Sequence, residues 1–134
     1  MGRLRGGRVP STRLSDCEPA LALAYTCLLH DFRDSTGHDL LLTCTSRSTD
    51  EQAKLYAQGR TTPGPVVTQL DGTTKKSKHN LVPARALDVA VVVNGKVSWD
   101  ESQYHPLKEL AAKYGLVSGG SWKTIVDWPH LELP

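Results

Sequence analysis

Apolar residues recur along the first part of the chain with the spacing of one helix face. The tetrapeptide Ser15-Asp16-Cys17-Glu18 has the pattern of a capping box, and Pro19 follows it at a position suited to the first helical turn. The helix predicted from this signal ends before Gly37, a residue type that commonly terminates helices. Its apolar face comprises Leu21, Ala24, Leu28 and Phe32.

A short strand and a second helix are predicted next. The segment from Leu40 to Thr45 is apolar and rich in residues that favour strands. A second capping box, Ser48-Thr49-Asp50-Glu51, predicts a helix that runs through Gln58 and ends at Gly59. Residues 60–78 show little periodicity, so we expect a long loop, and a loop of that length in a compact domain is usually functional.

The second half of the chain carries the clearest local signal, a β-hairpin. Ala86 to Val93 reads as a strand, Asn94-Gly95 favours a type I′ turn, and Lys96 to Trp99 returns antiparallel. Pro129 to Leu133 predicts a last short strand, placed at a sheet edge because proline lacks a backbone donor. Between them, a helix ending at Gly115 is predicted from the spacing of Leu107, Leu110, Ala111 and Tyr114.

This order of elements predicts one small α+β domain, with helices packed on a short antiparallel sheet. A chain of 134 residues is long enough to bury a core without disulfides or structural metals. We assign residues 15–134 to the domain. Residues 1–14 are assigned to a basic flexible N-terminal arm, because arginines there precede the first acidic residue, Asp16, and account for the net charge of +2.

Composition excludes several classes of function. The longest apolar run is interrupted by Asp88, so we expect no membrane insertion. No apolar stretch follows the basic start, so we expect no signal peptide and synthesis in the cytoplasm. Positive charge is confined to the arm, without interleaved aromatic residues, which argues against nucleic-acid binding. The three cysteines are odd in number and lack CxxC spacing, so we expect buried thiols.

Residues that could bind a metal lie in three separate places. His79 stands at the end of the long loop, Asp88 in the first strand of the hairpin, and His130 in the last strand. Two histidines and a carboxylate supply the three ligands with which a catalytic zinc keeps a fourth position open for water. Each residue taken alone has an ordinary alternative, since a lone histidine is often structural and Asp88 could be a buried hydrogen-bonding carboxylate.

Other polar residues nearby could complete such a site. Asp127, three residues before His130, is a candidate base for a metal-bound water. Glu132 shares a strand face with His130 and suits a hydrogen bond from the ring N–H of a ligand histidine. Arg47, between the first strand and the second helix, could stabilise a negatively charged intermediate. We therefore expect the site in a surface cleft.

The order of these motifs resembles a known family. The chain contains Ser77-x-His79, Ala86-x-Asp88 and Asp127-x-Pro129-His130-x-Glu132, preceded by Thr45-Ser46-Arg47-Ser48 and Glu51-Gln52-x-x-Leu55-Tyr56. Together they resemble the zinc peptidases that comprise D-alanyl-D-alanine carboxypeptidases, vancomycin-resistance D,D-dipeptidases and phage L-alanyl-D-glutamate endolysins. The likeness runs from about residue 40 to the end of the chain.

The resemblance implies a role for each matching residue. His79, Asp88 and His130 would bind one catalytic zinc ion, Asp127 would act as general base and acid, and Arg47 would steady the oxyanion or the substrate carbonyl. The aspartate at the base position is similar to the phage branch. One departure is the step from His79 to Asp88, which spans nine residues where the family has seven. Residues implied to support the ligands or contact substrate are Glu132, Ser77 and Gln52.

The function implied is a zinc-dependent peptidoglycan peptidase that cleaves the L-alanyl-D-glutamate bond of the stem peptide with a metal-activated water. One alternative is a D,D-carboxypeptidase or dipeptidase that releases terminal D-alanine, and another is a non-catalytic wall-binding module. The likeness to endolysins further implies a bacteriophage lysis protein that acts on the bacterial cell wall as a monomer. A holin-type partner would then release it from the cytoplasm.

Overall fold

The computed structural model describes residues 10–134, and residues 1–9 lie outside the described part of the chain. The Ser11 backbone donates to the Ser46 carbonyl at 3.0 Å, and its own carbonyl accepts from the Thr45 amide at 2.7 Å. Leu14 packs against the core. Ser11 and Leu14, at the end of the arm predicted over residues 1–14, are thus in contact with the domain. The prediction for residues 1–9 falls outside the described residues.

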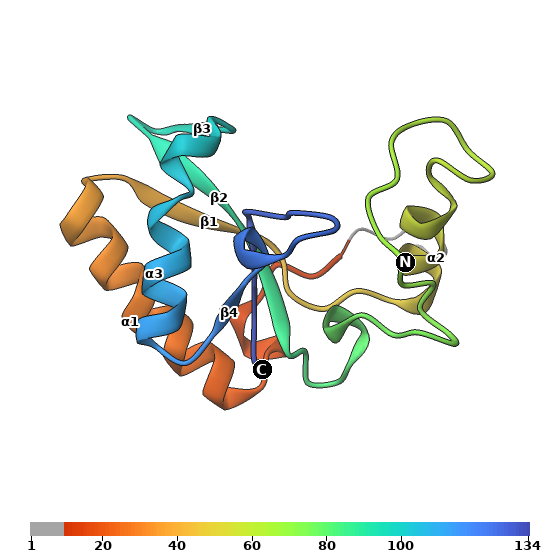
Figure 1. Cartoon of the computed structure of the whole chain (residues 1–134). Helices are drawn as coiled ribbons and strands as arrows, with labels where there is room; N and C mark the ends of the chain where they lie inside the picture. The colour runs from red at the N-terminus through yellow and green to blue at the C-terminus, as the bar shows by residue number, and fades with distance from the viewer. Residues whose placement is uncertain (1–9) are drawn as a thin grey trace.

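The described chain forms α-helices and one antiparallel sheet, which confirms the α+β prediction (Figure 1). The α-helices are α1 (Pro19–Thr36), α2 (Thr49–Ala57) and α3 (Pro106–Lys113). The strands are β1 (Asp39–Cys44), β2 (Ala86–Val93), β3 (Lys96–Ser98), β4 (Val117–Ser118) and β5 (His130–Glu132). Short 3₁₀ turns are η1 (Leu14–Asp16), η2 (Lys78–Asn80), η3 (Glu101–Gln103) and η4 (Gly119–Ser121).

Helix α1 begins at Pro19, and the first predicted capping box is wrong. Glu18 precedes the helix without a side-chain cap, and its backbone amide instead donates to the Ala84 carbonyl at 2.8 Å. The helix ends as predicted at Gly37, whose φ of 74° suits glycine. Cys27 is exposed on this helix, which corrects the expectation of three buried thiols; Cys17 and Cys44 are buried. The buried face of α1 comprises Leu21, Tyr25, Leu28 and Phe32.

Helix α2 starts at the capping box predicted for it. The Ser48 hydroxyl accepts from the Glu51 amide at 3.1 Å, and the Glu51 carboxylate accepts from the Ser48 amide at 2.6 Å. Two otherwise unpaired amides of the first turn are thereby satisfied. Residues 58–77 then form the long loop expected after this helix, without a named helix or strand.

Strand β2 is the centre of the sheet. It pairs antiparallel with β1 along one edge and with β5 and β3 along the other. Asn94 and Gly95 have φ values of 51° and 79°, so the predicted type I′ hairpin turn is confirmed. Strand β5 was expected at an edge, but β4 pairs with its free side and makes it internal.

The core lies on one face of this sheet, where α1 and α3 pack against each other and cover it (Figure 1). Leu87, Val89 and Val91 of β2 point into that core. Because successive strand residues face opposite sides, Asp88 projects from the other face, where it lines a cleft together with residues of α2 and the long loop. Among the described helices, none has the length and apolar character needed to cross a membrane.

Candidate metal centre

The register of the sheet brings two of the predicted ligands together. Asp88 on β2 lies opposite His130 on β5 in the antiparallel pairing. Their side chains meet on the face away from the core, with His130 Nδ1 3.0 Å from Asp88 Oδ1. His130 is 5% exposed, so the contact is largely shielded from solvent. A buried imidazole next to a carboxylate is a pair of side chains that can bind a metal ion.

The third predicted ligand, His79, comes from the short turn η2. The Ser77 hydroxyl caps this turn by accepting from the His79 amide at 3.2 Å, while the Asn80 side chain accepts from the Ser77 amide at 2.9 Å. Asn80 also donates to the Arg47 carbonyl at 2.8 Å, which fixes η2 to the segment before α2. His79 Nε2 thereby lies 3.2 Å from Asp88 Oδ1.

The nine-residue step between His79 and Asp88 leaves these two side chains in contact. Ala84, within the longer link, exchanges backbone hydrogen bonds with Asp16 and Glu18 at 2.9 and 2.8 Å. The Arg85 guanidinium forms an ion pair with the Glu18 carboxylate. The additional residues are therefore anchored to the N-terminal segment, and the link returns to β2 in register.

The two histidines and Asp88 are electrostatically coupled. Burial alone would lower the pKa of each imidazole, but hydrogen bonds to Asp88 outweigh it and raise the pKa of His79 and His130 to about 9. Burial raises the pKa of Asp88, yet the two histidines hold it well below its usual range. One carboxylate thus balances two cationic rings. A divalent cation could replace the positive charge of the two ring protons, so the donor set fits a metal ion.

The outward nitrogen of each ring has its own acceptor. His79 Nδ1 lies 2.8 Å from the Thr45 carbonyl, and His130 Nε2 lies 2.8 Å from Glu132 Oε1. Each ring can donate an N–H outward while its other nitrogen faces Asp88, as in metal-ligating histidines. Lys78 Nζ in turn lies 2.8 Å from Glu132 Oε2. Burial raises the pKa of Glu132, but the bonds from His130 and Lys78 outweigh it and lower that pKa.

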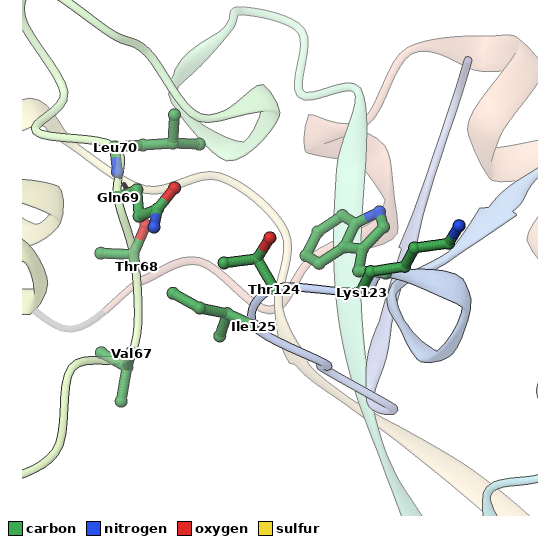
Figure 2. Close-up of a pocket in the computed structure, with 8 residues that line it drawn as sticks. Val67, Thr68, Gln69, Leu70, Lys123, Thr124 and Ile125 are labelled. Carbon is green, nitrogen blue, oxygen red and sulfur yellow. Dashed lines mark hydrogen bonds between the residues drawn. The ribbon is translucent and has the colours of Figure 1, made fainter.

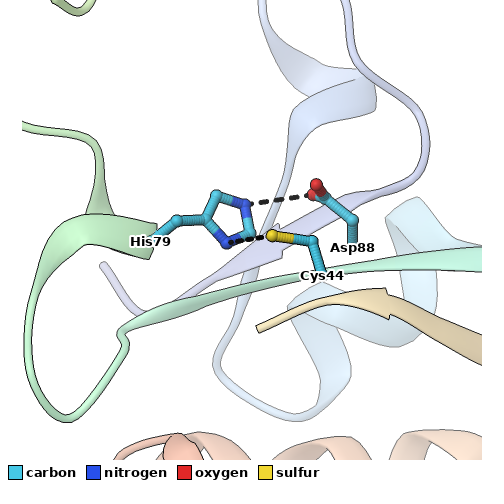
Figure 3. A group of neighbouring side chains, drawn as sticks. All are labelled: Cys44, His79 and Asp88. Atoms are coloured by element: carbon cyan, nitrogen blue, oxygen red, sulfur yellow. Dashed lines mark hydrogen bonds and ion pairs between the residues drawn. The ribbon is translucent and has the colours of Figure 1, made fainter. Parts of the chain in front are cut away.

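Cys44 belongs to a second possible ligand group with His79 and Asp88 (Figure 3). Its sulfur lies 3.6 Å from His79 Nδ1, the nitrogen that already faces the Thr45 carbonyl. Asp88 contacts the other nitrogen, as Figure 3 shows. The thiol therefore lies behind the His79 ring, whereas His79 Nε2 and His130 Nδ1 both face Asp88 and could hold an ion with it.

Asp127 lies beside this set, within the loop before β5. Its carboxylate, Asp88 and His130 offer ligand atoms that all lie within 4.8 Å of one another. Burial raises the pKa of Asp127, and the negative charge of Asp88 raises it further. A carboxylate of raised pKa is suited to exchange a proton near neutral pH.

Two glycines of η4 allow the Asp127 segment to approach so closely. The Asp127 amide donates to the Gly119 carbonyl at 3.0 Å. A Cβ atom at Gly119 would lie 2.1 Å from the Asp127 carbonyl oxygen, and one at Gly120 would lie 2.2 Å from the Trp128 ring. A side chain at Gly119 would therefore displace the Asp127 backbone, and one at Gly120 would displace the Trp128 ring.

Arg47 and Gln52 form the opposite side of the site. Arg47 Nη2 lies 3.5 Å from Asp88 Oδ2, and Nη1 donates to Gln52 Oε1 at 2.8 Å. The Gln52 amide donates to the Leu70 carbonyl at 2.9 Å, which joins α2 to the long loop. Both side chains of this pair are therefore held in place before any substrate binds.

The long loop closes over the site to form a cleft of about 270 Å³. Trp122 stands at its wall, with its ring 4.7 Å from that of His130. Beyond Trp122 the cleft continues into an open groove of about 390 Å³ between residues 67–70 and residues 122–125 (Figure 2). Predicted site residues that line the cleft are Arg47, Gln52, Ser77, His79, Asp88, Asp127 and His130.

All eight predicted site residues meet in this region, while their chemical roles stay predictions. Glu132 lies behind His130 and outside the cleft lining. Asn80 was missed by the sequence analysis, although Ser77-x-x-Asn80 has the spacing of a capping box and carried the signal. The Thr45 carbonyl was missed as a partner of His79, since a backbone acceptor leaves no mark in the residue types.

The chain is similar in sequence and in fold to known peptidases. The family model described as D-alanyl-D-alanine carboxypeptidase matches residues 71–133. The peptidoglycan L-alanyl-D-glutamate endopeptidase CwlK of Bacillus subtilis (strain 168) is 36% identical over 107 residues, which are 72% of this chain and 62% of that protein. The chain thus spans less than two thirds of the length of this curated relative.

The crystal structure of the L-Ala D-Glu endopeptidase ChiX of Serratia marcescens has the same fold. It superimposes with a TM-score of 0.67 and 23% sequence identity, over 96% of this chain and 92% of that one. The family model covers the segment that carries His79, Asp88, Asp127 and His130, and the resemblance found in the motifs is confirmed. Over the segment that carries these four residues, the chain is similar to the D-alanyl-D-alanine carboxypeptidase family of peptidases.

Proposed function

We propose that this protein is a zinc-dependent peptidoglycan peptidase that hydrolyses the L-alanyl-D-glutamate bond of the stem peptide. The proposal rests on the position of Asp88 Oδ1, which lies 3.2 Å from His79 Nε2 and 3.0 Å from His130 Nδ1. Asp127 stands beside them at an open cleft. The similarity to CwlK, an L-alanyl-D-glutamate endopeptidase, supports the choice of bond.

His79 Nε2, Asp88 and His130 Nδ1 would hold the metal. Two imidazoles and one carboxylate are ligands that zinc accepts while keeping a position open for water. When bound, zinc acts as a Lewis acid and lowers the pKa of its water toward about 7.

Asp127 and Arg47 have the two other catalytic roles in this proposal. Asp127, with its raised pKa, accepts the proton of the attacking water and delivers it to the departing amine. Arg47 supplies a fixed positive charge to the oxyanion that develops on the substrate carbonyl. Its guanidinium is already oriented by Gln52 and Asp88, so little reorganisation is needed when that charge forms.

The shape of the cleft favours an endopeptidase over an enzyme that trims a terminal residue. The groove between residues 67–70 and 122–125 extends the cleft past Trp122. An endopeptidase must accommodate its substrate on both sides of the scissile bond, whereas a D,D-carboxypeptidase holds a free terminal carboxylate next to it. The description of the matching family model keeps the D,D-carboxypeptidase as the second candidate.

Mass spectrometry of digested muropeptides separates the two candidates. The zinc-loaded protein is incubated with purified peptidoglycan, and the products are compared with those of the Asp127→Ala variant. Release of stem peptides with a new D-glutamate amino terminus supports the endopeptidase. Loss of a single terminal alanine supports the carboxypeptidase, and intact muropeptides with both proteins support a non-catalytic wall-binding module.

The biological setting is a further part of the proposal. The aspartate at position 127 resembles the phage branch and supports a bacteriophage endolysin; the relatives named above come from bacteria. We propose a monomer that is synthesised in the cytoplasm and reaches the cell wall with a holin-type partner. Expression in a bacterial host tests this setting, since lysis should require co-expression of a holin. Lysis without it, or a dimer in sedimentation analysis, would contradict the proposal.

A further inference from the structure

A second hollow lies beside Asp127, next to the cleft. Its volume is about 260 Å³. Asp127 lines both this hollow and the cleft, so the two adjoin at the proposed general base. We call it the aromatic hollow, because Trp99, Tyr104 and Trp128 form much of its wall. The remaining lining residues are Glu101, Val126, Asp127 and Pro129.

Trp99 presents an indole to solvent in a fixed orientation. It is 64% exposed, and its ring stacks within 6° of parallel to that of Tyr104, with centroids 6.0 Å apart. Tyr104 itself is buried, and its hydroxyl donates to the Ser98 carbonyl at 2.6 Å and accepts from the Val91 amide at 2.9 Å. The sheet therefore holds Tyr104, and Tyr104 supports one face of the indole.

The apolar surface of the hollow extends beyond this indole. Val126 is 50% exposed, although it is a β-branched apolar residue. Trp128 is partly buried and packs against His105, with ring centroids 4.6 Å apart. A contiguous patch of exposed apolar side chains beside a catalytic cleft is typical of a binding surface.

The rim of the hollow is polar and acidic. Glu101 and Asp127 contribute carboxylates, which accept hydrogen bonds. A flat aromatic face with acceptors at its rim matches a pyranose ring, which has an apolar C–H face and a border of hydroxyl donors. Among the described residues, no lysine or arginine lines the hollow. The lining therefore offers no cationic partner for an anion.

We propose that the aromatic hollow binds the sugar that carries the stem peptide. This inference rests on the proposed function, because in that substrate a single alanine separates the muramyl sugar from the scissile bond. The sugar would lie against Trp99, and the reacting carbonyl would lie in the cleft beside Asp127. The far part of the stem peptide would extend along the groove between residues 67–70 and 122–125.

A pair of substrates tests the inference through turnover. One is the disaccharide tripeptide that carries N-acetylmuramic acid, and the other is the same tripeptide with an acetyl group in place of the sugar. Trp99→Ala should raise KM for the sugar-bearing peptide by roughly fivefold to tenfold, the range of a lost aromatic contact, and leave the acetylated peptide unaffected. Trp99→Tyr should keep the KM for the sugar-bearing peptide close to the wild-type value. Equal effects of Trp99→Ala on both substrates, or on neither, would overturn it.

Direct binding provides a readout that needs no turnover. The disaccharide without peptide is titrated against the protein while its tryptophan fluorescence is recorded. Saturable binding is expected for the wild type and for Leu23→Ala, a control at another exposed apolar residue on α1. Binding should be lost in Trp99→Ala with an unchanged melting temperature. Equal binding by Trp99→Ala, no binding by the wild type, or a wild-type dimer that this variant dissociates would overturn the inference.

The two experiments separate failure of this inference from failure of the proposed function. If the wild type cleaves neither peptide yet binds the disaccharide through Trp99, the aromatic hollow stands and the assigned bond is wrong. If it cleaves both peptides with the same KM and Trp99→Ala changes neither, the function stands and the hollow is no sugar site.

Discussion

Glu132 Oε1 lies 2.8 Å from His130 Nε2, while the other nitrogen of the same ring lies 3.0 Å from Asp88 Oδ1. Glu132 thus accepts the outward N–H of the imidazole and turns Nδ1 toward Asp88. Lys78, 2.8 Å from the second Glu132 oxygen, keeps this carboxylate ionised and in place. The orientation of one ligand therefore depends on an ion pair that does not itself contact the cleft.

Replacement of Glu132 should weaken zinc binding without removing a ligand. Glu132→Ala should lower zinc affinity by about 10- to 100-fold, the usual cost of losing the acceptor behind a ligand histidine. Glu132→Gln should lower zinc affinity less than Glu132→Ala does, because the glutamine side chain keeps an oxygen acceptor. Competition against a chelator of known affinity measures both. Glu109→Ala, an exposed acid on α3, is the control, and equal affinities in all four proteins would contradict the orienting role.

Metal uptake should release protons. In the metal-free protein the pKa of His79 and His130 is about 9, so both rings are protonated at pH 7, whereas a metal ligand must be neutral. Calorimetric titration with zinc in buffers of different ionisation enthalpy should show net proton release at pH 7 that declines as the pH rises through 9. Heats that are independent of the buffer at pH 7 would contradict this coupling.

The same groups should make the stability of the metal-free protein depend on pH. Their folded pKa, about 9, exceeds the unfolded value of 6.5. The stabilisation is therefore complete below pH 6.5 and is lost as the pH rises through 9. The melting temperature of the protein in the presence of a chelator should fall across that window. In the His79→Gln variant the melting temperature should fall less. A melting temperature that rises over the same window would contradict the sign.

Gly119 should be intolerant of any side chain. A Cβ atom there would meet the Asp127 carbonyl oxygen at 2.1 Å, and neither backbone can yield without moving Asp127. Gly119→Ala should therefore reduce kcat by about 10² or more, comparable to loss of a general base. Ser121→Ala, an exposed change in the same turn, should leave kcat unchanged. Full activity and an unchanged melting temperature in Gly119→Ala would contradict the close approach.

The three cysteines should differ in reactivity. Cys27 is exposed on α1, whereas Cys17 and Cys44 are buried, and burial raises the pKa of the Cys17 thiol to about 11. A disulfide reagent should therefore modify Cys27 rapidly and the other two only when the protein unfolds. Cys27→Ser should abolish the rapid phase. Rapid modification of more than one thiol in the native protein would contradict the burial pattern.

Local signals predicted local structure well. The Asn94-Gly95 turn and the Ser48–Glu51 capping box depend on residues close in sequence, and both appear as expected. The similar signal at Ser15 failed because a distant segment competes for the same backbone. The amide of Glu18 donates to the Ala84 carbonyl, and the Ala84 amide donates to the Asp16 carbonyl, so Cys17 and Glu18 are extended between η1 and α1.

The position of β5 could not be predicted from its own residues. Pro129 precedes the strand, so its missing amide costs no ladder bond, and its carbonyl accepts from the Val89 amide at 3.0 Å. The neighbour that makes β5 internal, β4, has only two residues, too few to show a period. An edge assignment from proline alone therefore failed.

The ligand set could be named from motifs, but its assembly could not. Asp88 and His130 meet because β2 and β5 pair in one register, and that register is a property of the whole sheet. The contact of Gln52 with the Leu70 carbonyl likewise depends on the path of a loop without periodicity. Both relationships arise from tertiary packing.

The central claim is that Asp127 moves the proton at a zinc site formed by His79, Asp88 and His130. It is tested most directly by measuring zinc content and peptidoglycan hydrolysis together in the wild type and in Asp127→Ala. The expected result is a single bound zinc ion in both proteins, with new D-glutamate amino termini from the wild type and a rate lower by about 10² or more in the variant. Equal rates in the two zinc-loaded proteins, or intact peptidoglycan with the zinc-loaded wild type, would contradict the claim.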